Sequence, residues 1–399
     1  MARRTTPSKP ERVLISGGGI AGLTLAIRLK EAGYEPLVVE REPALRTEGY
    51  MMDFFGTGWD VAERMGLVER LRAIRYPIDA LEFVGRDGEA YYTVPISRVR
   101  RALDGRYVYL RRPDLERILY DRARERGVTV RFGRSVKSLK QTKASVSVTF
   151  DDGTRETFAL VFGADGVHSR IRELVFGGES RFSRFLGGYV AAFHLPRHAY
   201  PIGQALKLYE EPERVAAFYP LDEQRMDATY VLRHEEVSLK AGERLPFLRK
   251  QFEGAGWIAE DMLQKYEGDE PIYFDSLTQI VMDRWHEGRV ALLGDACGCL
   301  TLLAGQGSHM AMAGGYVLAR ELVRHGGDHE AAFAAYQDLL MEPVTRKQNE
   351  AAGFETVFIP SESSRPWLRR LAVRLLFGPL LLRLVFRMLG GRSALAGYS

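Results

Sequence analysis

The sequence predicts an α/β protein in which a Rossmann-like domain is interrupted by a mainly antiparallel β-sheet domain and followed by a C-terminal helical segment. Three observations support this prediction. Near the N-terminus, an apolar strand runs into a glycine-rich turn and then into a helix. From about Glu179, strand-like runs follow one another with no helical pattern between them. In the stretch Arg365–Arg392, leucines recur at helical spacing between arginines.

The glycine-rich turn has the spacing G-x-G-x-x-G in the context that gives this motif its meaning. The strand Arg12–Ser16 precedes it, and a helix that ends at Gly33 follows it. Gly17 permits the tight turn, Gly19 lets the backbone approach a pyrophosphate, and Gly22 lets the helix pack closely on the strand. A glycine-rich turn without a ligand is the alternative interpretation, but the flanking strands favour dinucleotide binding.

The second strand, Tyr34–Glu40, ends on an acid about 20 residues beyond the turn, as dinucleotide-binding units do. The carboxylate of Glu40 can accept hydrogen bonds from ribose hydroxyls. The N-terminus of the preceding helix, which includes Ile20 and Ala21, presents free N–H groups and a positive dipole end to phosphates.

Composition limits the class of protein. The chain has 399 residues, of which 46% are hydrophobic and 27% charged, as in an ordinary globular protein. A net charge of +4 is too small to indicate nucleic-acid binding. The two cysteines, Cys297 and Cys299, build neither a disulfide framework nor a four-ligand zinc site, so we expect no metal and a reducing, cytoplasmic setting. The basic stretch Met1–Glu11 lacks the apolar core of a signal peptide, and we expect it to be disordered.

Turn residues and apolar periodicity divide the first half of the chain into short elements. Asp87-Gly88 marks a hairpin turn, and Pro113 opens a helix. The predicted elements are, in order, a helix over Trp59–Ile74, strands over Ala80–Val84 and Ala90–Val94, a basic loop over Arg98–Arg106, a strand over Tyr107–Leu110, a helix over Arg112–Arg126, and strands over Val128–Phe132, Val146–Phe150 and Glu156–Leu160.

The second half begins with the antiparallel sheet and returns to the first domain near residue 272. Its predicted elements are strands over Gly188–Leu195, Ala205–Tyr209, Val215–Tyr219 and Ala228–Arg233, helices over Leu245–Gly254 and Ile258–Tyr266, a return to the first domain over Ile272–Met282, a strand over Arg289–Leu293, and helices over Ser308–Arg324 and Glu330–Leu340. We therefore expect a discontinuous first domain over residues 11–75, 103–178 and 274–345, an inserted sheet domain over 76–102 and 179–273, and a helical segment over 346–399.

The stretch Arg365–Arg392 has two interpretations. Its longest apolar run is about eight residues, far below the roughly 20 that a transmembrane helix needs. The mixture of arginine with leucine, phenylalanine and tryptophan is typical of a helix that contacts a membrane surface peripherally. The alternative is that the apolar stripe packs on its own domain or on a twin subunit.

Three ordered motifs together resemble the class A flavoprotein monooxygenases, the aromatic hydroxylases with the p-hydroxybenzoate hydroxylase fold. The motifs are Gly17–Gly22 with Glu40-Arg41, the run Gly163–Arg170, and the run Gly288–Ala296 followed by Ala304–Ser308. Within that family the chain looks most similar to tetracycline-inactivating and polyketide-tailoring hydroxylases. The family's usual Gly-Asp-Ala-Ala-His is replaced here by Gly294-Asp295-Ala296-Cys297-Gly298, which changes the expected shape of this loop.

The resemblance implies a Rossmann-like FAD-binding domain of the GR2 type and a set of cofactor-binding residues. Arg112 matches an arginine that contacts the cofactor, with a helix-start surface charge as the alternative. Asp165 matches a motif associated with FAD and NAD(P)H, with a loop role as the alternative. The helix that begins near Gly307 would stabilise reduced flavin. The implied residues are Gly17, Gly19, Ile20, Ala21, Gly22, Glu40, Arg41, Arg112, Val136, Asp165, Asp295, Gly305, Gln306, Gly307 and Ser308.

The family's chemistry implies a hydroxylase that uses NADPH or NADH as a transient reductant and O2. A C4a-hydroperoxyflavin would transfer oxygen to an aromatic or polycyclic small molecule, and no catalytic side chain is named. Candidate pocket residues, each with an ordinary core or surface role as the alternative, are Arg46, Phe193, Tyr219, Arg233 and Phe274. Two other functions stay open: an FAD-dependent reductase of a lipid or isoprenoid double bond, similar to geranylgeranyl reductases, and a flavoprotein without enzymatic activity.

Overall fold

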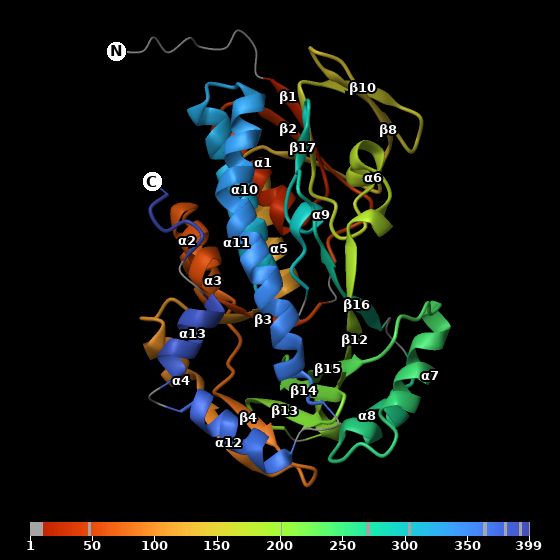
Figure 1. Ribbon diagram of the computed structural model, residues 1–399, viewed down its shortest axis with the longest axis vertical. Coiled ribbons are helices and arrows are strands. Elements are labelled where there is room, and N and C mark those ends of the chain that lie inside the picture. The colour runs from red at the N-terminus through yellow and green to blue at the C-terminus, as the bar shows by residue number, and fades with distance from the viewer. Residues whose placement is uncertain are drawn as a thin grey trace.

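A computed structural model describes residues 11–46, 49–200, 202–268, 272–301, 305–361, 365–378, 381–390 and 393–398. The described part of the chain has a mixed α/β fold (Figure 1). The N-terminal lead predicted over Met1–Glu11 lies outside it, apart from Glu11.

The first large sheet begins with the strand that precedes the glycine-rich turn. In order across the sheet its strands are β17 (His286–Glu287), β18 (Val290–Leu292), β11 (Leu160–Gly163), β1 (Arg12–Ser16), β2 (Glu35–Glu40) and β7 (Thr129–Phe132). All neighbours pair in parallel except β17 with β18. Because β1 lies at the centre, its carboxyl end opens between β2 and β11, where a Rossmann-like sheet binds its ligand.

Helices cover this sheet closely. On one side lie α1 (Ile20–Glu31), α10 (Gly307–Arg324) and the long α11 (His329–Phe358), and α5 (Arg112–Glu125) packs against α1 (Figure 1). The approach of α10 to α1 requires a glycine, because a Cβ on Gly315 would lie 2.8 Å from the carbonyl oxygen of Ala21. This packing fixes the N-termini of α1 and α10 relative to each other.

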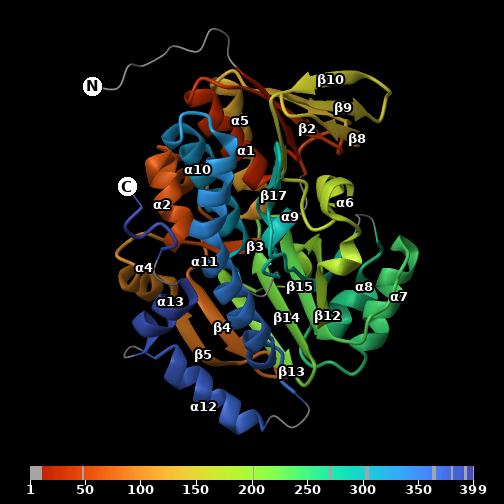
Figure 2. The ribbon, with the colours of Figure 1, turned by 45° about the horizontal axis from the view of Figure 1, so that its top comes forward.

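The second large sheet is mainly antiparallel. In order across it the strands are β16 (Tyr273–Ile280), β12 (Ser183–Pro196), β15 (Arg225–Arg233), β14 (Arg214–Pro220), β13 (Ala205–Glu211), β4 (Ala80–Val84) and β5 (Ala90–Pro95). The pair of β13 and β4 is parallel. The helices α7 (Ala241–Gln251) and α8 (Ala259–Lys265) cover one face, as Figure 2 shows.

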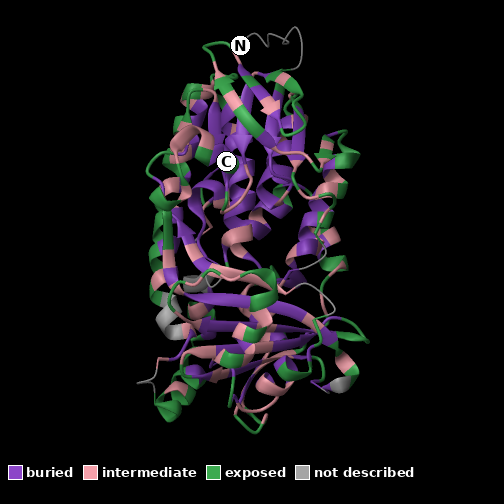
Figure 3. Cartoon of the chain, turned by 90° about the vertical axis from the view of Figure 1, so that its right-hand side faces the viewer, coloured by how far each residue is buried: buried purple, intermediate pink, exposed green. Residues whose placement is uncertain are grey.

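Smaller elements complete the fold. A ribbon of β3 (Met51–Phe54) and β6 (Val108–Arg111) packs against the uncovered face of the second sheet. A separate three-stranded sheet consists of β8 (Val136–Gln141), β9 (Val146–Phe150) and β10 (Arg155–Phe158). The C-terminal part contains α12 (Pro366–Leu376) and α13 (Leu382–Gly390). Buried residues concentrate in the strands of both large sheets (Figure 3).

Three sequence-based expectations differ from the structure. The helix expected over Trp59–Ile74 is split into α2 (Gly56–Arg64) and α3 (Val68–Ala73), because Gly66 adopts φ +67° between them. The loop expected over Arg98–Arg106 contains a helix, α4 (Ile96–Ala102), which buries Ile96 and Val99 at helical spacing. The stretch over which the chain is expected to return to the first domain instead forms β16, which pairs with β12 at the edge of the second sheet.

No helix in the described part of the chain is long and apolar enough to cross a bilayer.

Candidate active site

The glycine-rich turn forms one wall of a cavity at the carboxyl end of β1. Gly17 adopts φ +112°, and a Cβ there would lie 2.2 Å from the carbonyl oxygen of Ala164. A Cβ on Gly22 would lie 2.0 Å from the carbonyl oxygen of Gly17, so only glycine permits this contact between turn and helix. A Cβ on Gly19, in contrast, would meet only Glu116 Oε1, at 3.8 Å. The space beside Gly19 is therefore open for a ligand.

Glu40 ties the end of β2 to the turn. The backbone N–H of Gly18 donates to Glu40 Oε2 at 2.7 Å, and the N–H of Glu42 donates to Glu40 Oε1 at 3.1 Å. Each carboxylate oxygen keeps a further lone pair that can accept a hydrogen bond. The side chain is therefore held at both oxygens and lines the cavity, where its remaining lone pairs could accept from hydroxyls of a ligand.

The cavity is long and continues to the N-terminus of α10. Its first part is lined by the glycine-rich turn, Glu40, Arg112 and Asp165. Its second part is lined by residues of the second sheet and by Gly305, Gly307 and Ser308. Both parts share the residues Tyr50, Val167, Tyr273, Asp275 and Asp295. The arrangement fits an elongated molecule with phosphates at one end.

Arg112 supplies a cation in the middle of this cavity. It starts α5 and pairs with Glu116, Nη2 to Oε1, at 3.0 Å. Burial lowers the pKa of Arg112, but the carboxylates of Glu116 and Asp295 and the hydroxyl of Tyr50 raise it further than burial lowers it. Burial raises the pKa of Tyr50 to about 12, so its hydroxyl keeps its proton and can donate.

Asp295 lies where the two parts of the cavity meet. It begins the short helix α9 (Asp295–Gly298), and its Oδ1 is 3.9 Å from the Cβ position of Gly307. Burial raises the pKa of Asp295, which Arg112 opposes and the nearby Asp275 reinforces. The carboxylate is thus poised between a cation and the N-terminus of α10.

This raised pKa predicts the effect of Asp295→Asn on the cofactor-free protein. The folded Asp295 holds its proton to a higher pH than the unfolded group, whose pKa is near 3.8. Its contribution to stability is therefore complete below that pH and is lost as the pH rises through the folded pKa. Because asparagine does not titrate, we expect the melting temperature of Asp295→Asn to exceed that of the wild type at about pH 8, with the gain shrinking toward about pH 4.

Asp222→Asn is the control for this measurement. Burial raises the pKa of Asp222, but hydrogen bonds from Gln224 and Arg225 outweigh it and lower that pKa. This variant should therefore lose stability relative to the wild type as the pH rises. If the melting-temperature difference between Asp295→Asn and the wild type stayed constant across the pH range, the pKa of Asp295 would not be raised by burial.

The N-terminus of α10 closes the far end of the cavity. Gly305 adopts φ +58°, and Gly307 and Ser308 line the second part. Gln306 is buried and is the N-cap residue, and its Oε1 accepts a hydrogen bond from the buried Lys347 at 3.5 Å. The free N–H groups and the dipole of this 18-residue helix stabilise negative charge in the cavity.

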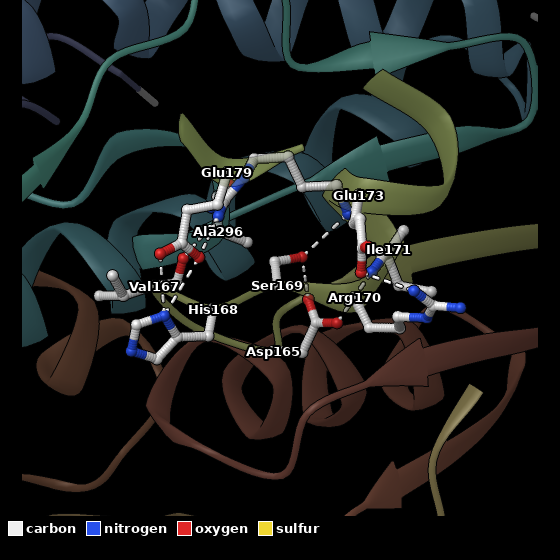
Figure 4. A network of polar contacts seen from close by, with 10 residues as sticks. Asp165, Val167, His168, Ser169, Arg170, Ile171, Glu173, Glu179 and Ala296 are labelled. Atoms are coloured by element: carbon white, nitrogen blue, oxygen red, sulfur yellow. Dashed lines mark hydrogen bonds and ion pairs between the residues drawn. The ribbon is translucent and has the colours of Figure 1, made fainter. Parts of the chain in front are cut away.

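Asp165 belongs to a polar network that holds α6 (Arg170–Phe176) (Figure 4). Its carboxylate accepts from Ser169 Oγ and from the N–H of Ile171 at 3.0 Å. Burial raises the pKa of Asp165, which these hydrogen bonds oppose. Asp165 lines the cavity and also fixes the start of a helix, so the two roles expected for it are compatible.

Arg172 links this network to the Asp295 segment, and no sequence pattern predicted this role. Its guanidinium, 1% exposed, donates to the carbonyl oxygens of Ala296 at 3.1 Å and Val167 at 2.6 Å. It also pairs with Glu179 at 2.9 Å. The side chain thereby joins α6 to the residue that follows Asp295.

The other expected cofactor residues divide into those that line the cavity and those that do not. Arg41, Arg46 and Val136 line its first part. Arg41 and Arg46 both approach Glu42, at 3.4 and 3.7 Å, and stay about half exposed at the rim. The residues Ile20, Ala21, Gly22 and Gln306 are not part of the lining. The side chains of Ile20, Ala21 and Gln306 are buried. Gly22, which has no side chain, permits the close packing of α1 on the turn.

The structure does not bring most of the expected substrate residues to the cavity. Phe193 stacks on Tyr230 with ring centroids 5.5 Å apart, on the sheet face that α7 and α8 cover. Phe274 stacks on Tyr189 at 5.2 Å on the same face. Both pack in the cluster under α7 and α8, and neither lines the cavity. Arg233 pairs with Glu213 at 2.7 Å at the far end of β15.

Tyr219 lies on the other face, toward the β3–β6 ribbon. Its hydroxyl oxygen accepts from the N–H of Met51 at 3.0 Å. Tyr219 is buried and packs behind the ribbon. The residue that it contacts, Met51, directly precedes Met52, which lines the cavity.

Several cavity residues were not expected from the sequence. Tyr50, Tyr273 and Asp275 come from distant parts of the chain and meet only in the fold. No local motif identifies them, because Tyr50 directly precedes the strand β3 and the other two lie within β16. Among the described residues, no cluster of His, Cys, Asp and Glu could hold a metal ion.

Comparisons with known proteins point to one family. The family described as "FAD binding domain" matches residues 11–337. An uncharacterised protein of Mycobacterium tuberculosis is 34% identical, over 81% of this chain and 88% of its own. A flavin-dependent monooxygenase of Legionella longbeachae is 30% identical, over 86% of this chain and 88% of its own. The crystal structure of tetracycline destructase Tet(55) superposes with a TM-score of 0.83 at 27% identity, covering 96% of this chain and 98% of that one.

Proposed function

Because this chain belongs to the family of FAD-binding, flavin-dependent monooxygenases, we propose that it uses FAD, NAD(P)H and O2 to hydroxylate an aromatic or polycyclic small molecule. NAD(P)H is the reductant typical of the family. The observation that carries the proposal is the continuous cavity from the glycine-rich turn to the N-terminus of α10. The reductase of a lipid double bond is not favoured by the relatives.

The residues along the cavity fit FAD. The open space at Gly19 and the N-terminus of α1 would hold the pyrophosphate, and Glu40 would hold a ribose. Arg112 and Asp295, at the centre, would contact the phosphates and the ribityl hydroxyls. Gly305, Gly307 and Ser308 would meet the ring system.

When bound, FAD supplies the redox chemistry and the activation of O2. The chain's own residues supply electrostatics and exclusion of water. The N-terminus of α10 stabilises negative charge at the ring end of the cavity, and the Tyr50 hydroxyl keeps its proton near the cation of Arg112. No side chain is assigned as a catalytic acid or base.

The substrate would lie between the N-terminus of α10 and the second sheet. There the cavity is lined by the apolar side chains of Met52, Val190 and Leu300 beside the hydroxyls of Ser276 and Thr278. An apolar wall with a few hydroxyls suits a fused-ring molecule that carries oxygen substituents. The similarity to a tetracycline destructase supports a polycyclic substrate of this kind.

We also propose a cytoplasmic location, where NAD(P)H is available, and peripheral contact of the C-terminal helices with a membrane. Exposed leucines between arginines on α12 and α13 support the membrane contact.

The test is reconstitution with FAD followed by turnover under ¹⁸O2. We expect a yellow protein that oxidises NAD(P)H faster when a fitting polycyclic phenol is added and that incorporates one ¹⁸O atom into the product. Product formed under nitrogen, without oxygen incorporation, would indicate the reductase instead. A protein that takes up no FAD would refute the proposal.

A further inference from the structure

The exposed apolar surface of this protein is concentrated at its C-terminal end. Among the described residues, ten large hydrophobic side chains are highly exposed, and seven of them lie between residues 367 and 384. These seven are Trp367, Leu368, Leu371, Leu375, Leu376, Leu381 and Leu384. Scattered exposed leucines are ordinary, but a contiguous group of this kind marks an interaction surface.

On α12 the exposed side chains form one stripe. Trp367, Leu371 and Leu375 are four residues apart, and Leu368 lies three residues before Leu371, so all four share a helix face. Trp367 is 59% exposed and Leu375 is 57% exposed, whereas Val373 on the opposite face is buried. We call these four residues the α12 stripe.

The opposite face of α12 is fixed to the second sheet, so the α12 stripe is held outward. Arg369 forms a two-bond ion pair with Glu210 of β13, at 2.6 and 2.8 Å. The hydroxyl of Tyr92 donates to the carbonyl oxygen of Phe377 at 3.0 Å. Figures 1 and 2 show α12 along the end of the molecule farthest from β1 and β2.

The C-terminal sequence that contains the α12 stripe carries charge of a single sign, although Glu210 and Asp104 from other elements pair with Arg369 and Arg383. After Glu362 the sequence contains seven arginines and no lysine, aspartate or glutamate, a charge larger than the +4 of the whole chain. Arg365, Arg370 and Arg374 lie on α12 or directly before it and are exposed. Arg370 packs over the Tyr91 ring at 5.0 Å, so its charge stays near the helix surface.

We infer that the α12 stripe and its arginines dock on an anionic lipid surface. This inference rests on the peripheral membrane contact proposed above, but it does not depend on the oxygenase reaction. Leucine and tryptophan enter the boundary between head groups and acyl chains, and arginines at the same level meet anionic head groups. A second copy of this chain fits less well, because pairing the two surfaces would bring like-charged arginine clusters together.

The test measures co-sedimentation of the full-length protein with phosphatidylcholine vesicles that contain or lack phosphatidylglycerol. We expect binding only to the anionic vesicles and a decrease at high salt. The combined variant Trp367→Ser, Leu371→Ser and Leu375→Ser should bind at least about tenfold more weakly. The matched control, Val323→Ser with Leu339→Ser, removes exposed apolar side chains elsewhere and should bind as the wild type does.

Tryptophan fluorescence supplies a second readout. Trp59 and Trp285 are buried, and Trp257 is half-buried against Phe218 of the second sheet, away from the α12 stripe. Insertion of Trp367 should therefore shift the emission to shorter wavelength on anionic vesicles, and Trp367→Phe should abolish this shift. Wild type that stays in the supernatant at low salt would overturn the inference, as would a stripe variant that binds unchanged. A dimer that the stripe variant loses in sedimentation equilibrium would assign the surface to a second copy. FAD uptake is measured without vesicles, so failure of the oxygenase proposal is seen separately.

Discussion

Gly19→Val is expected to abolish FAD binding while leaving the protein folded. Gly19 adopts φ −82° and ψ −170°, an extended conformation that valine accepts readily. Its side chain would enter the open space bounded by Glu116 Oε1 and occupy the path of the pyrophosphate. We expect the dissociation constant for FAD to rise at least about 100-fold, equal to about 2.8 kcal/mol, with little change in the melting temperature of the cofactor-free protein.

Quenching of FAD fluorescence measures the affinity, and two further variants make the result specific. Gly178→Val adds the same side chain at an extended position where a Cβ meets nothing within 4 Å, and it should bind FAD normally. Gly22→Ala should instead lower the melting temperature, because its Cβ would overlap the carbonyl oxygen of Gly17. Gly19→Val that binds FAD within about threefold of the wild type would place the phosphates elsewhere.

These two glycines illustrate what the sequence could predict. The turn, its flanking strands and Glu40 lie within 30 residues, and their roles follow from local geometry that a spacing pattern records. The mixed α/β class was predicted in the same way, from the spacing of apolar residues and from the strand-like runs that begin near Glu179. The family assignment came from three ordered motifs and was confirmed by the comparisons.

The substrate side was predicted poorly, for a physical reason. Residues Gly188–Phe193 of β12 are all buried. Helices α7 and α8 cover one face of this strand, and the β3–β6 ribbon packs on the other. Alternation of polar and apolar residues is therefore missing, and the sequence does not tell which parity faces the cavity. Phe193, a candidate pocket residue with a core role as the alternative, lies on the face that α7 and α8 cover, whereas Val190 lines the cavity.

The arrangement of charged residues was also a poor guide to local structure. Arginines over Arg98–Arg106 suggested a loop, although Ile96 and Val99 carry the helical spacing of α4. A buried arginine such as Arg172 is equally invisible, because it is one of many in the chain and its partners Val167 and Ala296 offer only backbone carbonyls. Partners of this kind leave no trace in side-chain composition.

Arg172→Leu is expected to cost about 3 kcal/mol of unfolding free energy, the second large effect that the structure predicts. The substitution leaves the carbonyl oxygens of Ala296 and Val167 without this donor in a largely buried setting. Glu179, whose side chain is 36% exposed, loses one partner and keeps His168. Arg170→Leu, two residues earlier on the same helix, is the matched control. Its guanidinium is 43% exposed, pairs with Glu173 and donates to the carbonyl oxygen of Lys137 at 2.9 Å, so its loss should lower stability by no more than about 1 kcal/mol.

Denaturant unfolding of the cofactor-free variants measures this difference, and FAD titration shows whether Arg172 also positions the site. Because Arg172 holds the carbonyl of Ala296, directly after Asp295, its loss should weaken FAD binding as well as stability. Arg172→Lys keeps the charge but has no planar fork to reach both carbonyls, so it should recover only part of either effect. If Arg172→Leu lost stability yet bound FAD as the wild type does, the guanidinium would hold α6 alone and Asp295 would be positioned by Arg112 and the packing of α10.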